Sequence, residues 1–249
     1  MKIIGRAKLC RMKLLVSISS IDEVDDALNG GASIVDVKNP SEGALGANFP
    51  WIIKDVKKFV KNRVELSATI GDLPYLPGTA SLACYAVSSL GIDYVKAGLK
   101  DVKSKEEAKT MVSSLSKAIK QAGKAKLICV CYADFKHINS ISPLEIPEIV
   151  KEYGGSGVMI DVCKKGLGSL TELLSNDFIK EFVSKAKELG LIVGLAGGIN
   201  KENLKQVIAF NPDVIGFRRG ICIETSNGLK VSKEKVMEIN KMLSSFTIP

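Results

Sequence analysis

Three lysines and several aspartates stand at the ends of short apolar segments of the sequence. Asp36 and Lys38 are two residues apart, so an extended chain places both on one face. Lys96 and Asp161 end two later apolar segments, and Lys165 follows four residues after Asp161. A lysine that is partly removed from water beside other cations loses affinity for its proton. Such an amine can form a Schiff base with a carbonyl, and the aspartates could move the protons that this chemistry requires.

Each of these residues also has a plainer interpretation, as a solvated charge at the end of a strand. This alternative is strongest for Lys165, which lies beside Lys164 in a predicted loop. It is weaker for Lys38 and Lys96, because both are set in otherwise apolar segments. The pattern therefore favours a reactive lysine at a site built from strand ends, without deciding which lysine reacts.

Two glycine-containing segments near the end of the chain indicate an anion site. Gly197 and Gly198 follow one apolar segment, and Arg218, Arg219 and Gly220 follow the next. Glycines leave backbone N–H groups accessible, and barrel enzymes often hold a phosphate between the loops after their last two strands. A glycine pair alone could be a plain turn, but the adjacent arginines favour a phosphate.

The elements that would position these residues alternate regularly along the chain. Short β-branched apolar runs alternate with amphipathic stretches, which predicts eight strand–helix units. The predicted strands span 14–18, 33–37, 65–69, 93–97, 126–131, 157–161, 191–196 and 213–217. The predicted helices span 21–29, 50–60, 78–90, 104–121, 146–153, 177–189, 201–210 and 233–243. No glycine-rich fingerprint follows the first strand, so a single (β/α)8 TIM barrel is favoured over a doubly wound sheet.

Length and composition agree with one barrel domain. The chain has 249 residues, of which 46% are hydrophobic and 25% are charged, and such barrels take about 250 residues. We expect residues 1–11 to be an N-terminal extension, with Met12 as an alternative start, and residues 12–249 to form the catalytic domain. No apolar run approaches the roughly 20 residues that cross a membrane, and no secretory signal is recognisable.

The net charge and the spacing of the cysteines limit which ligands, metals and cellular compartments we expect for this chain. The net charge of +8 admits nucleic acid, but the lysines are spread over polar helix faces, so we expect a phosphorylated small molecule instead. The six cysteines form no CxxC pair and there is one histidine, which argues against a zinc site and for reduced thiols in the cytoplasm. We predict no metal, no cofactor and no membrane partner, and we expect a homo-oligomer.

Longer motifs carry a resemblance to a known family. The sixteen-residue run DVKNPSEGALGANFPW, residues 36–51, resembles (5-formylfuran-3-yl)methyl phosphate synthases of methanofuran biosynthesis. Shorter matches are SATIGD at 67–72, PGT at 77–79, YVKAGL at 94–99, YAD at 132–134, ID at 160–161 and LAG at 195–197. The resemblance runs from about Met12 to the C-terminal helix.

The resemblance implies a class I aldolase-like barrel that condenses two triose phosphates, nominally glyceraldehyde 3-phosphate. A phosphorylated furan aldehyde forms, and one phosphate and water are lost. Lys38 would be the Schiff-base lysine and Asp36 its neighbouring acid or base. Lys96, Asp161 and Lys165 would complete the catalytic set.

Two segments depart from the family pattern. The match at 161–166 is loose, so that Lys164 could take the role of Lys165. The run FRRGIC at 217–222 has an arginine where the family favours a small residue. The furan product could also serve another methanofuran-type C1 carrier.

Two other functions fit parts of the pattern. Another phosphate-handling Schiff-base aldolase, such as one resembling deoxyribose-phosphate aldolase, would use the same lysine chemistry but would not explain residues 36–51. A basic binding module without catalysis would gain nothing from lysines set in apolar strands. Borohydride trapping with a triose phosphate would distinguish an enzyme from the binding module. The product formed from triose phosphate alone would distinguish this reaction from that of another aldolase.

Overall fold

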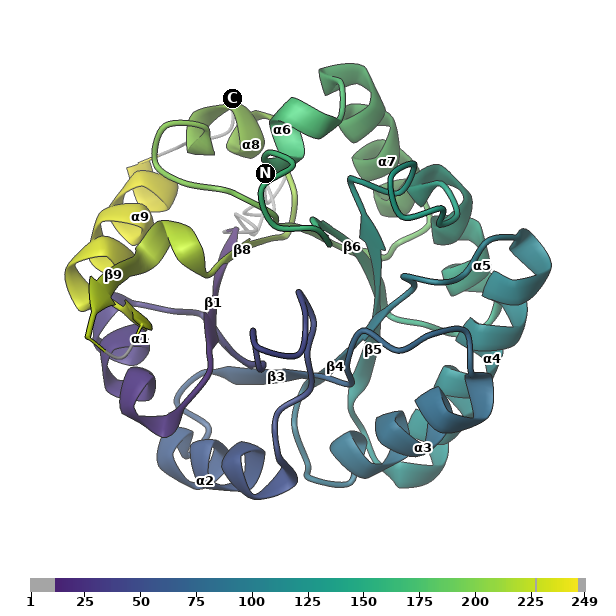
Figure 1. Ribbon diagram of the computed structural model, residues 1–249, viewed down its shortest axis with the longest axis horizontal. Helices are drawn as coiled ribbons and strands as arrows, with labels where there is room; N and C mark the ends of the chain where they lie inside the picture. The colour runs from purple at the N-terminus through teal and green to yellow at the C-terminus, as the bar shows by residue number, and fades with distance from the viewer. Residues whose placement is uncertain (1–11, 227, 246–249) are drawn as a thin grey trace, which may run out of the picture.

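Eight parallel strands form a closed barrel in the computed structural model, which describes residues 12–226 and 228–245. The strands pair in chain order and β8 closes onto β1 (Figure 1). They are β1 Lys13–Ile18, β2 Ile34–Val37, β3 Glu65–Thr69, β4 Tyr94–Gly98, β5 Lys126–Tyr132, β6 Gly157–Asp161, β7 Ile192–Leu195 and β8 Val214–Phe217. The predicted barrel and the order of its strands are confirmed. The predicted extension, residues 1–11, lies outside the described residues.

Helices surround the barrel and follow their strands as predicted (Figure 1). They are α1 Val24–Gly30, α2 Pro50–Val60, α3 Pro77–Ser88, α4 Lys105–Ala122, α5 Ile146–Glu152, α6 Leu170–Leu173, α7 Asn176–Glu188, α8 Leu204–Ala209 and α9 Lys233–Ser245. Ser104 and Ser175 cap the N-termini of α4 and α7, because their hydroxyl oxygens accept hydrogen bonds from the N–H groups of Glu107 and Phe178. Within the described ranges, no helix is long and apolar enough to span a membrane.

Three features differ from the sequence prediction. The short helix α6, Leu170–Leu173, was not predicted. Helix α8 begins at Leu204 instead of residue 201. The side chain of Asn200 accepts from the Asn203 N–H at 3.1 Å, and that of Asn203 accepts from the Asn200 N–H at 2.9 Å. These bonds form a turn in place of the first helical turn. An antiparallel hairpin, β9 Cys222–Thr225 and β10 Gly228–Val231, was not predicted and lies between β8 and α9.

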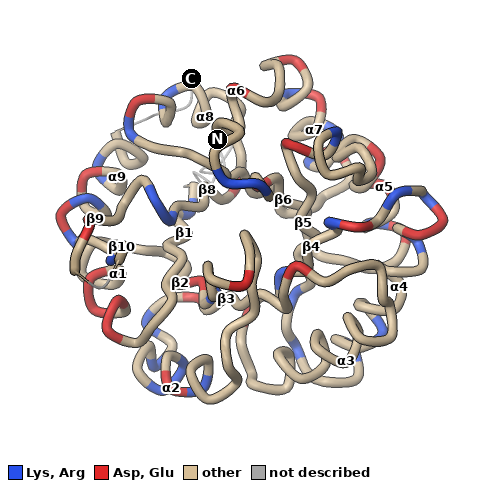
Figure 2. The backbone as a smooth tube through the Cα atoms, in the orientation of Figure 1, with Lys and Arg blue, Asp and Glu red and all other residues tan. Residues whose placement is uncertain are grey.

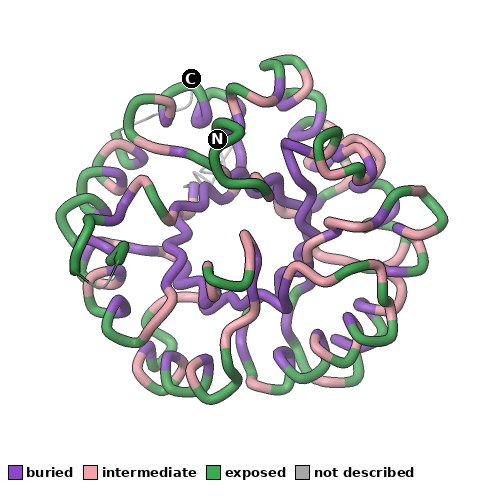
Figure 3. The backbone as a smooth tube through the Cα atoms, in the orientation of Figure 1, coloured by how far each residue is buried: buried purple, intermediate pink, exposed green. Residues whose placement is uncertain are grey.

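The strands are buried on both faces, which explains their continuous apolar sequences (Figure 3). Side chains on the outer faces pack against the helices, and a second cluster fills the barrel interior. That interior cluster includes Ile34 on β2, Tyr94 on β4 and Met159 on β6. Because side chains alternate along a strand, the residues two positions further on also face the interior. The β2, β4 and β6 residues at those positions are Asp36, Lys96 and Asp161.

Candidate active site

A cavity of about 480 Å³ opens at the carboxyl ends of the barrel strands. Basic and acidic residues are distributed around the outer helices as well as at this mouth (Figure 2). All but one of the residues predicted for the site line the cavity, namely Lys38, Lys96, Asp161, Lys165, Gly197, Gly198, Arg218, Arg219 and Gly220. The exception, Asp36, is fully buried. The eight-stranded closure thus brings residues from β2 to β8 to one place.

Asp36 and Lys96 form a buried ion pair. Lys96 Nζ lies 2.7 Å from Asp36 Oδ2, and the two side chains are 3% and 0% exposed. The Ser17 hydroxyl on β1 donates to the same oxygen at 2.9 Å. Burial acts to raise the pKa of Asp36, but the ammonium groups of Lys96 and Lys38 outweigh it and hold that pKa below its ordinary value. Asp36 is therefore an ionised carboxylate, and it holds the Lys96 amine in place beside the cavity.

Lys38 follows β2 and is almost as deeply buried, yet it has a different partner. Its Nζ donates to the backbone carbonyl of Ala44 at 3.1 Å. Burial lowers the pKa of Lys38, and the positive charges of Lys96 and Arg218 lower it further. The carboxylates of Asp161 and Asp36 act in the opposite direction and do not prevail. Lys38 therefore releases its proton more readily than an ordinary lysine.

Asp161 ends β6 on the opposite side of the barrel interior from β2. Burial raises the pKa of Asp161, although Lys38 and Lys96 oppose that rise. Its Oδ1 accepts a hydrogen bond from the Val162 N–H at 2.8 Å, which fixes the carboxyl group. Asp161 thus keeps a proton to higher pH than an ordinary aspartate, and it is placed to exchange that proton within the cavity.

The two lysines of the loop after β6 point to different places. Lys165 Nζ donates to the Pro40 carbonyl at 3.2 Å, so its side chain reaches toward the segment that follows β2. Lys164 Nζ donates instead to the His137 carbonyl at 3.3 Å. Asp134 fixes this loop by accepting from the backbone N–H groups of Cys163 and Lys164 at 2.8 and 2.9 Å. Both lysines are exposed, unlike Lys38 and Lys96.

The loops after β7 and β8 combine open backbone groups with two arginines. Gly197 and Gly198 have φ values of +97° and +65°, which side-chain-bearing residues rarely adopt. The N–H groups of this pair donate to no other described residue. Arg218 lines the cavity, and Arg219 is exposed at the rim.

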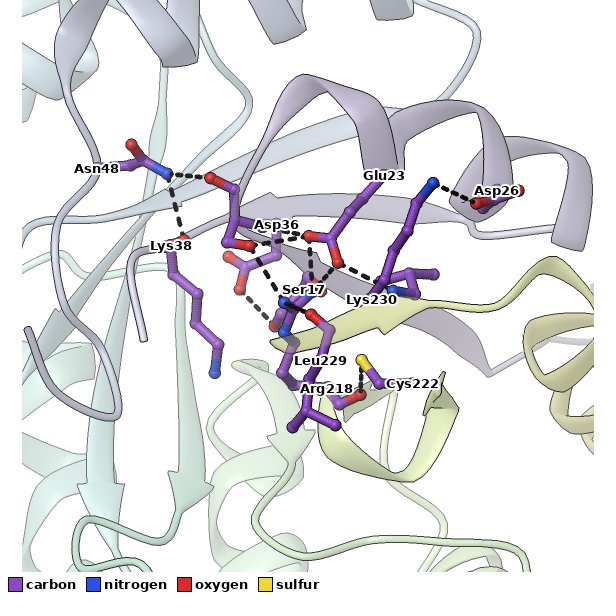
Figure 4. A network of polar contacts seen from close by, with 12 residues as sticks. Ser17, Glu23, Asp26, Asp36, Lys38, Asn48, Arg218, Cys222, Leu229 and Lys230 are labelled. Atoms are coloured by element: carbon purple, nitrogen blue, oxygen red, sulfur yellow. Dashed lines mark hydrogen bonds and ion pairs between the residues drawn. The ribbon is translucent and has the colours of Figure 1, made fainter. Parts of the chain in front are cut away.

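Both terminal nitrogens of Arg218 are already engaged within the protein (Figure 4). Its Nη1 contacts both carboxylate oxygens of Glu23 at 2.8 and 2.7 Å and the Ser17 carbonyl at 3.1 Å. Its Nη2 contacts the Ser19 hydroxyl at 3.1 Å and the Leu229 carbonyl at 3.2 Å. Arg218 thus links β8, the start of α1 and the hairpin, and contributes its charge to the cavity from a fixed position.

Several residues that shape the site were not assigned to it from the sequence. Ser17 could have been found, because it occupies an inward position near the end of β1. Glu23 could not, because it is separated from Arg218 by 195 positions. Asp72 follows the third predicted strand and was visible as a strand-end carboxylate, but its contact with Tyr132, whose hydroxyl donates to Asp72 at 2.6 Å, needed the structure. Among residues 12–226 and 228–245, no group of three or more His, Cys, Asp or Glu side chains is placed to hold a metal ion.

Comparison with known proteins adds the family to this geometry. The model of the 4-HFC-P synthase family matches residues 14–240. The chain belongs to this family. It is 41% identical to the (5-formylfuran-3-yl)methyl phosphate synthase of Archaeoglobus fulgidus, over 92% of this chain and 97% of that protein. It is 44% identical to the enzyme of the same name from Methanosarcina acetivorans, over 85% of this chain and 91% of that protein. The chain is accordingly an enzyme.

Solved structures support the fold. A 3-hexulose-6-phosphate synthase from Salmonella typhimurium matches with a TM-score of 0.66 at 15% identity, over 94% of this chain and 99% of the other. A structure described as an aldolase, QR15, matches with a TM-score of 0.66 at 16% identity, over 97% of this chain and 100% of the other. Both the family and the barrel expected from the sequence are thus confirmed.

Proposed function

We propose that this enzyme condenses two molecules of glyceraldehyde 3-phosphate into (5-formylfuran-3-yl)methyl phosphate through a Schiff base on Lys38. The observation that carries the proposal is the environment of Lys38. It is a buried amine with a lowered pKa, and its hydrogen-bond partner is a neutral carbonyl. The name of the relatives supports the product, which would supply the furan of a methanofuran-type C1 carrier.

The first step uses the neutral form of Lys38. Its nitrogen lone pair attacks the carbonyl carbon of the first triose phosphate, a C–N bond forms, and the carbonyl oxygen takes a proton from Asp161. The resulting hydroxyl leaves as water after a second protonation, which gives a protonated imine. Because burial raises its pKa, Asp161 can supply a proton at a pH where an ordinary aspartate could not.

The later steps return the lysine and form the ring. A carboxylate removes the proton next to the imine carbon, and the enamine attacks the aldehyde carbon of the second triose phosphate to form a C–C bond. Water releases Lys38 from the condensed product. Ring closure with loss of one phosphate and water then gives the furan. The reactants exceed the product by the elements of one phosphate and two waters, so no oxidant or reductant is required.

The Asp36–Lys96 pair would supply a fixed positive charge to this chemistry. Lys96 is held by Asp36 at 2.7 Å, so its charge is fixed beside Lys38 and can stabilise negative charge that develops on substrate oxygen. Asp36 lies behind the cavity wall, so it would act as an acid or base toward the lysines and not toward substrate directly. Lys165 acts at the rim, where its exposed amine can meet a phosphate.

We further propose that the substrate phosphates bind at the loops after β7 and β8. Gly197 and Gly198, whose N–H groups have no partner among the described residues, line the same cavity as Gly220 and Arg219. Arg219 is exposed and can turn toward an anion. Arg218 would act mainly through its positive potential, because its two terminal nitrogens are engaged by Glu23 and backbone carbonyls.

One incubation tests the proposal. The purified enzyme with glyceraldehyde 3-phosphate alone should produce an ultraviolet-absorbing furan aldehyde and an equal amount of inorganic phosphate. Borohydride added during turnover should inactivate the enzyme and leave a reduced triose phosphate on Lys38, identified by peptide mass spectrometry. Lys38→Arg is the matched control, because it keeps the charge and removes the nucleophile. An adduct on Lys96 or Lys165 would show that another lysine reacts, and absence of furan would reject the reaction.

A further inference from the structure

The segment between β2 and α2, residues 38–49, crosses the middle of the barrel mouth (Figure 1). One of its peptide groups, between Ala44 and Leu45, is bound at both of its polar ends. Its carbonyl accepts from Lys38 Nζ at 3.1 Å, and its N–H donates to Asp72 Oδ2 at 3.0 Å. A single peptide group therefore connects a carboxylate after β3 with the amine after β2.

We propose that Asp72 is a positioning residue, which fixes the Ala44–Leu45 peptide group so that its carbonyl holds the Lys38 amine in its reactive orientation. This inference rests on the proposed role of Lys38 as the nucleophile. Asp72 does not line the cavity, so it would act only through the peptide group.

Asp72 is itself held from several sides. The Tyr132 hydroxyl donates to Asp72 Oδ1 at 2.6 Å. Burial raises the pKa of Tyr132, and the Asp72 carboxylate raises it further, so the phenol remains a donor at neutral pH. A Cβ atom at Gly43 would collide with the Asp72 carboxylate, and one at Gly98 would collide with the Tyr132 hydroxyl. Two glycines thus leave space for this pair of residues.

The peptide group affects the amine in two ways. A carboxylate that accepts from the N–H polarises the peptide and makes its carbonyl a stronger acceptor. The carbonyl takes one N–H of Lys38, so the nitrogen lone pair can be directed to substrate. The carboxylates of Asp36 and Asp161 compete for the same amine, while Lys96 and Arg218 repel it. Without the fixed carbonyl, Lys38 could turn to Asp161 and remain charged as an ion pair.

The experiment measures the reactivity of Lys38 in the free enzyme. Reductive methylation with formaldehyde and a borane reductant is followed across pH by peptide mass spectrometry, with exposed Lys54 as internal standard. Asp72→Leu removes the acceptor at similar volume. We expect Lys38 to turn to the Asp161 carboxylate in this variant, which favours the charged amine. The pH midpoint of Lys38 labelling should therefore rise by about one unit, which slows labelling near neutral pH about tenfold.

Thr69→Val is the matched control, because Thr69 also anchors this segment. Its hydroxyl donates to the Gly46 carbonyl at 2.8 Å and does not contact the Ala44–Leu45 peptide group. We expect Thr69→Val to change Lys38 labelling less than about threefold. Equal changes in both variants would overturn the proposal, since general loosening of the segment would then explain them. Unchanged labelling in Asp72→Leu would overturn it as well.

Two further measurements keep the outcomes distinct. If Asp72→Leu does not fold, Asp72→Asn keeps the shape and one acceptor while removing the charge, and it should give a smaller shift in the same direction. No shift there would overturn the proposal. Borohydride trapping with glyceraldehyde 3-phosphate is run on the same proteins. A wild-type enzyme that forms no triose adduct, while Lys38 methylation responds to Asp72, would reject the proposed function and leave the positioning role intact.

Discussion

One buried lysine lies within β4 and another directly follows β2, but the two lysines have different partners. Lys96 contacts the Asp36 carboxylate at 2.7 Å, whereas Lys38 contacts a backbone carbonyl at 3.1 Å. Burial alone lowers the pKa of any lysine. The Asp36 carboxylate holds Lys96 directly, whereas the neutral carbonyl leaves burial and the nearby cations to lower the pKa of Lys38. The difference in hydrogen-bond partner therefore supports the opposite roles proposed for these two lysines, a fixed charge on β4 and a nucleophile after β2.

The largest expected effect separates these two roles directly. Lys38→Arg should lower turnover at least about 10³-fold and abolish the borohydride-trapped adduct, because arginine cannot form a Schiff base. Lys96→Arg should slow turnover but leave measurable adduct, because the charge beside Asp36 is retained. Adduct yield is measured by intact mass. Equal adduct in the two variants would mean that the comparison assigns the nucleophile wrongly.

Asp161→Asn should have the next largest effect, a loss of about 10²-fold or more in kcat. The wild-type profile of kcat/KM against pH should be bell-shaped. The neutral amine of Lys38 appears as pH rises through its lowered pKa, and protonated Asp161 disappears as pH rises through its raised pKa. Both midpoints should lie between those of an ordinary aspartate and an ordinary lysine.

The same variant should also move the Lys38 midpoint. The Asp161 carboxylate raises the pKa of Lys38, so its removal should shift the remaining limb to lower pH. Residual activity is measured across pH together with the wild type. A limb that moves to higher pH would contradict the arrangement in which Asp161 faces the amine.

The free energy of unfolding should rank the two lysines in the opposite order from turnover, with the larger loss for the Lys96 variant. Lys96→Met removes one partner of a buried ion pair and leaves Asp36 without its closest cation, so we expect a loss of about 3 kcal/mol in the free energy of unfolding. Lys38→Met removes a buried amine whose charged form is disfavoured, so stability should stay equal or increase by about 1 kcal/mol. Urea unfolding at pH 7 measures both. A large loss for Lys38→Met would show that its environment is not poised against the charge.

Much of this comparison could be anticipated from the sequence. Apolar segments of the right length, with Lys38 and Lys96 at their ends, predicted both the barrel and the face on which they meet. The pairing could not be predicted. Asp36 is two residues from Lys38, yet its carboxylate bonds to Lys96, which is 60 residues away, and to Ser17. Register across strands decides which neighbours meet, and one sequence contains no direct record of register.

The contacts of Arg218 at the cavity mouth were harder to predict than the positions of the buried lysines. Arg218 was expected near a phosphate, and its engagement with Glu23 depends on how the β9–β10 hairpin packs beside α1. The hairpin itself was missed, because exposed Ile223 and Leu229 alternate with charged residues in two short strands. Such segments carry little of the periodic signal that marked the buried strands.

The smallest expected effect extends the comparison of lysines to this rim. Lys164 and Lys165 are adjacent and exposed, but only Lys165 reaches toward Pro40, and Lys164 is bound to the His137 carbonyl. Lys165→Ala should raise KM about tenfold, which corresponds to one charge-assisted hydrogen bond of about 1.4 kcal/mol to a phosphate. Lys164→Ala should change KM less than about twofold, because Lys164 also lines the cavity but its amine is held by the His137 carbonyl. Because exposed charges are screened by salt, the difference between the variants should shrink as ionic strength rises. Steady-state kinetics at two salt concentrations measure this, and a larger effect of Lys164→Ala would transfer the role to that residue.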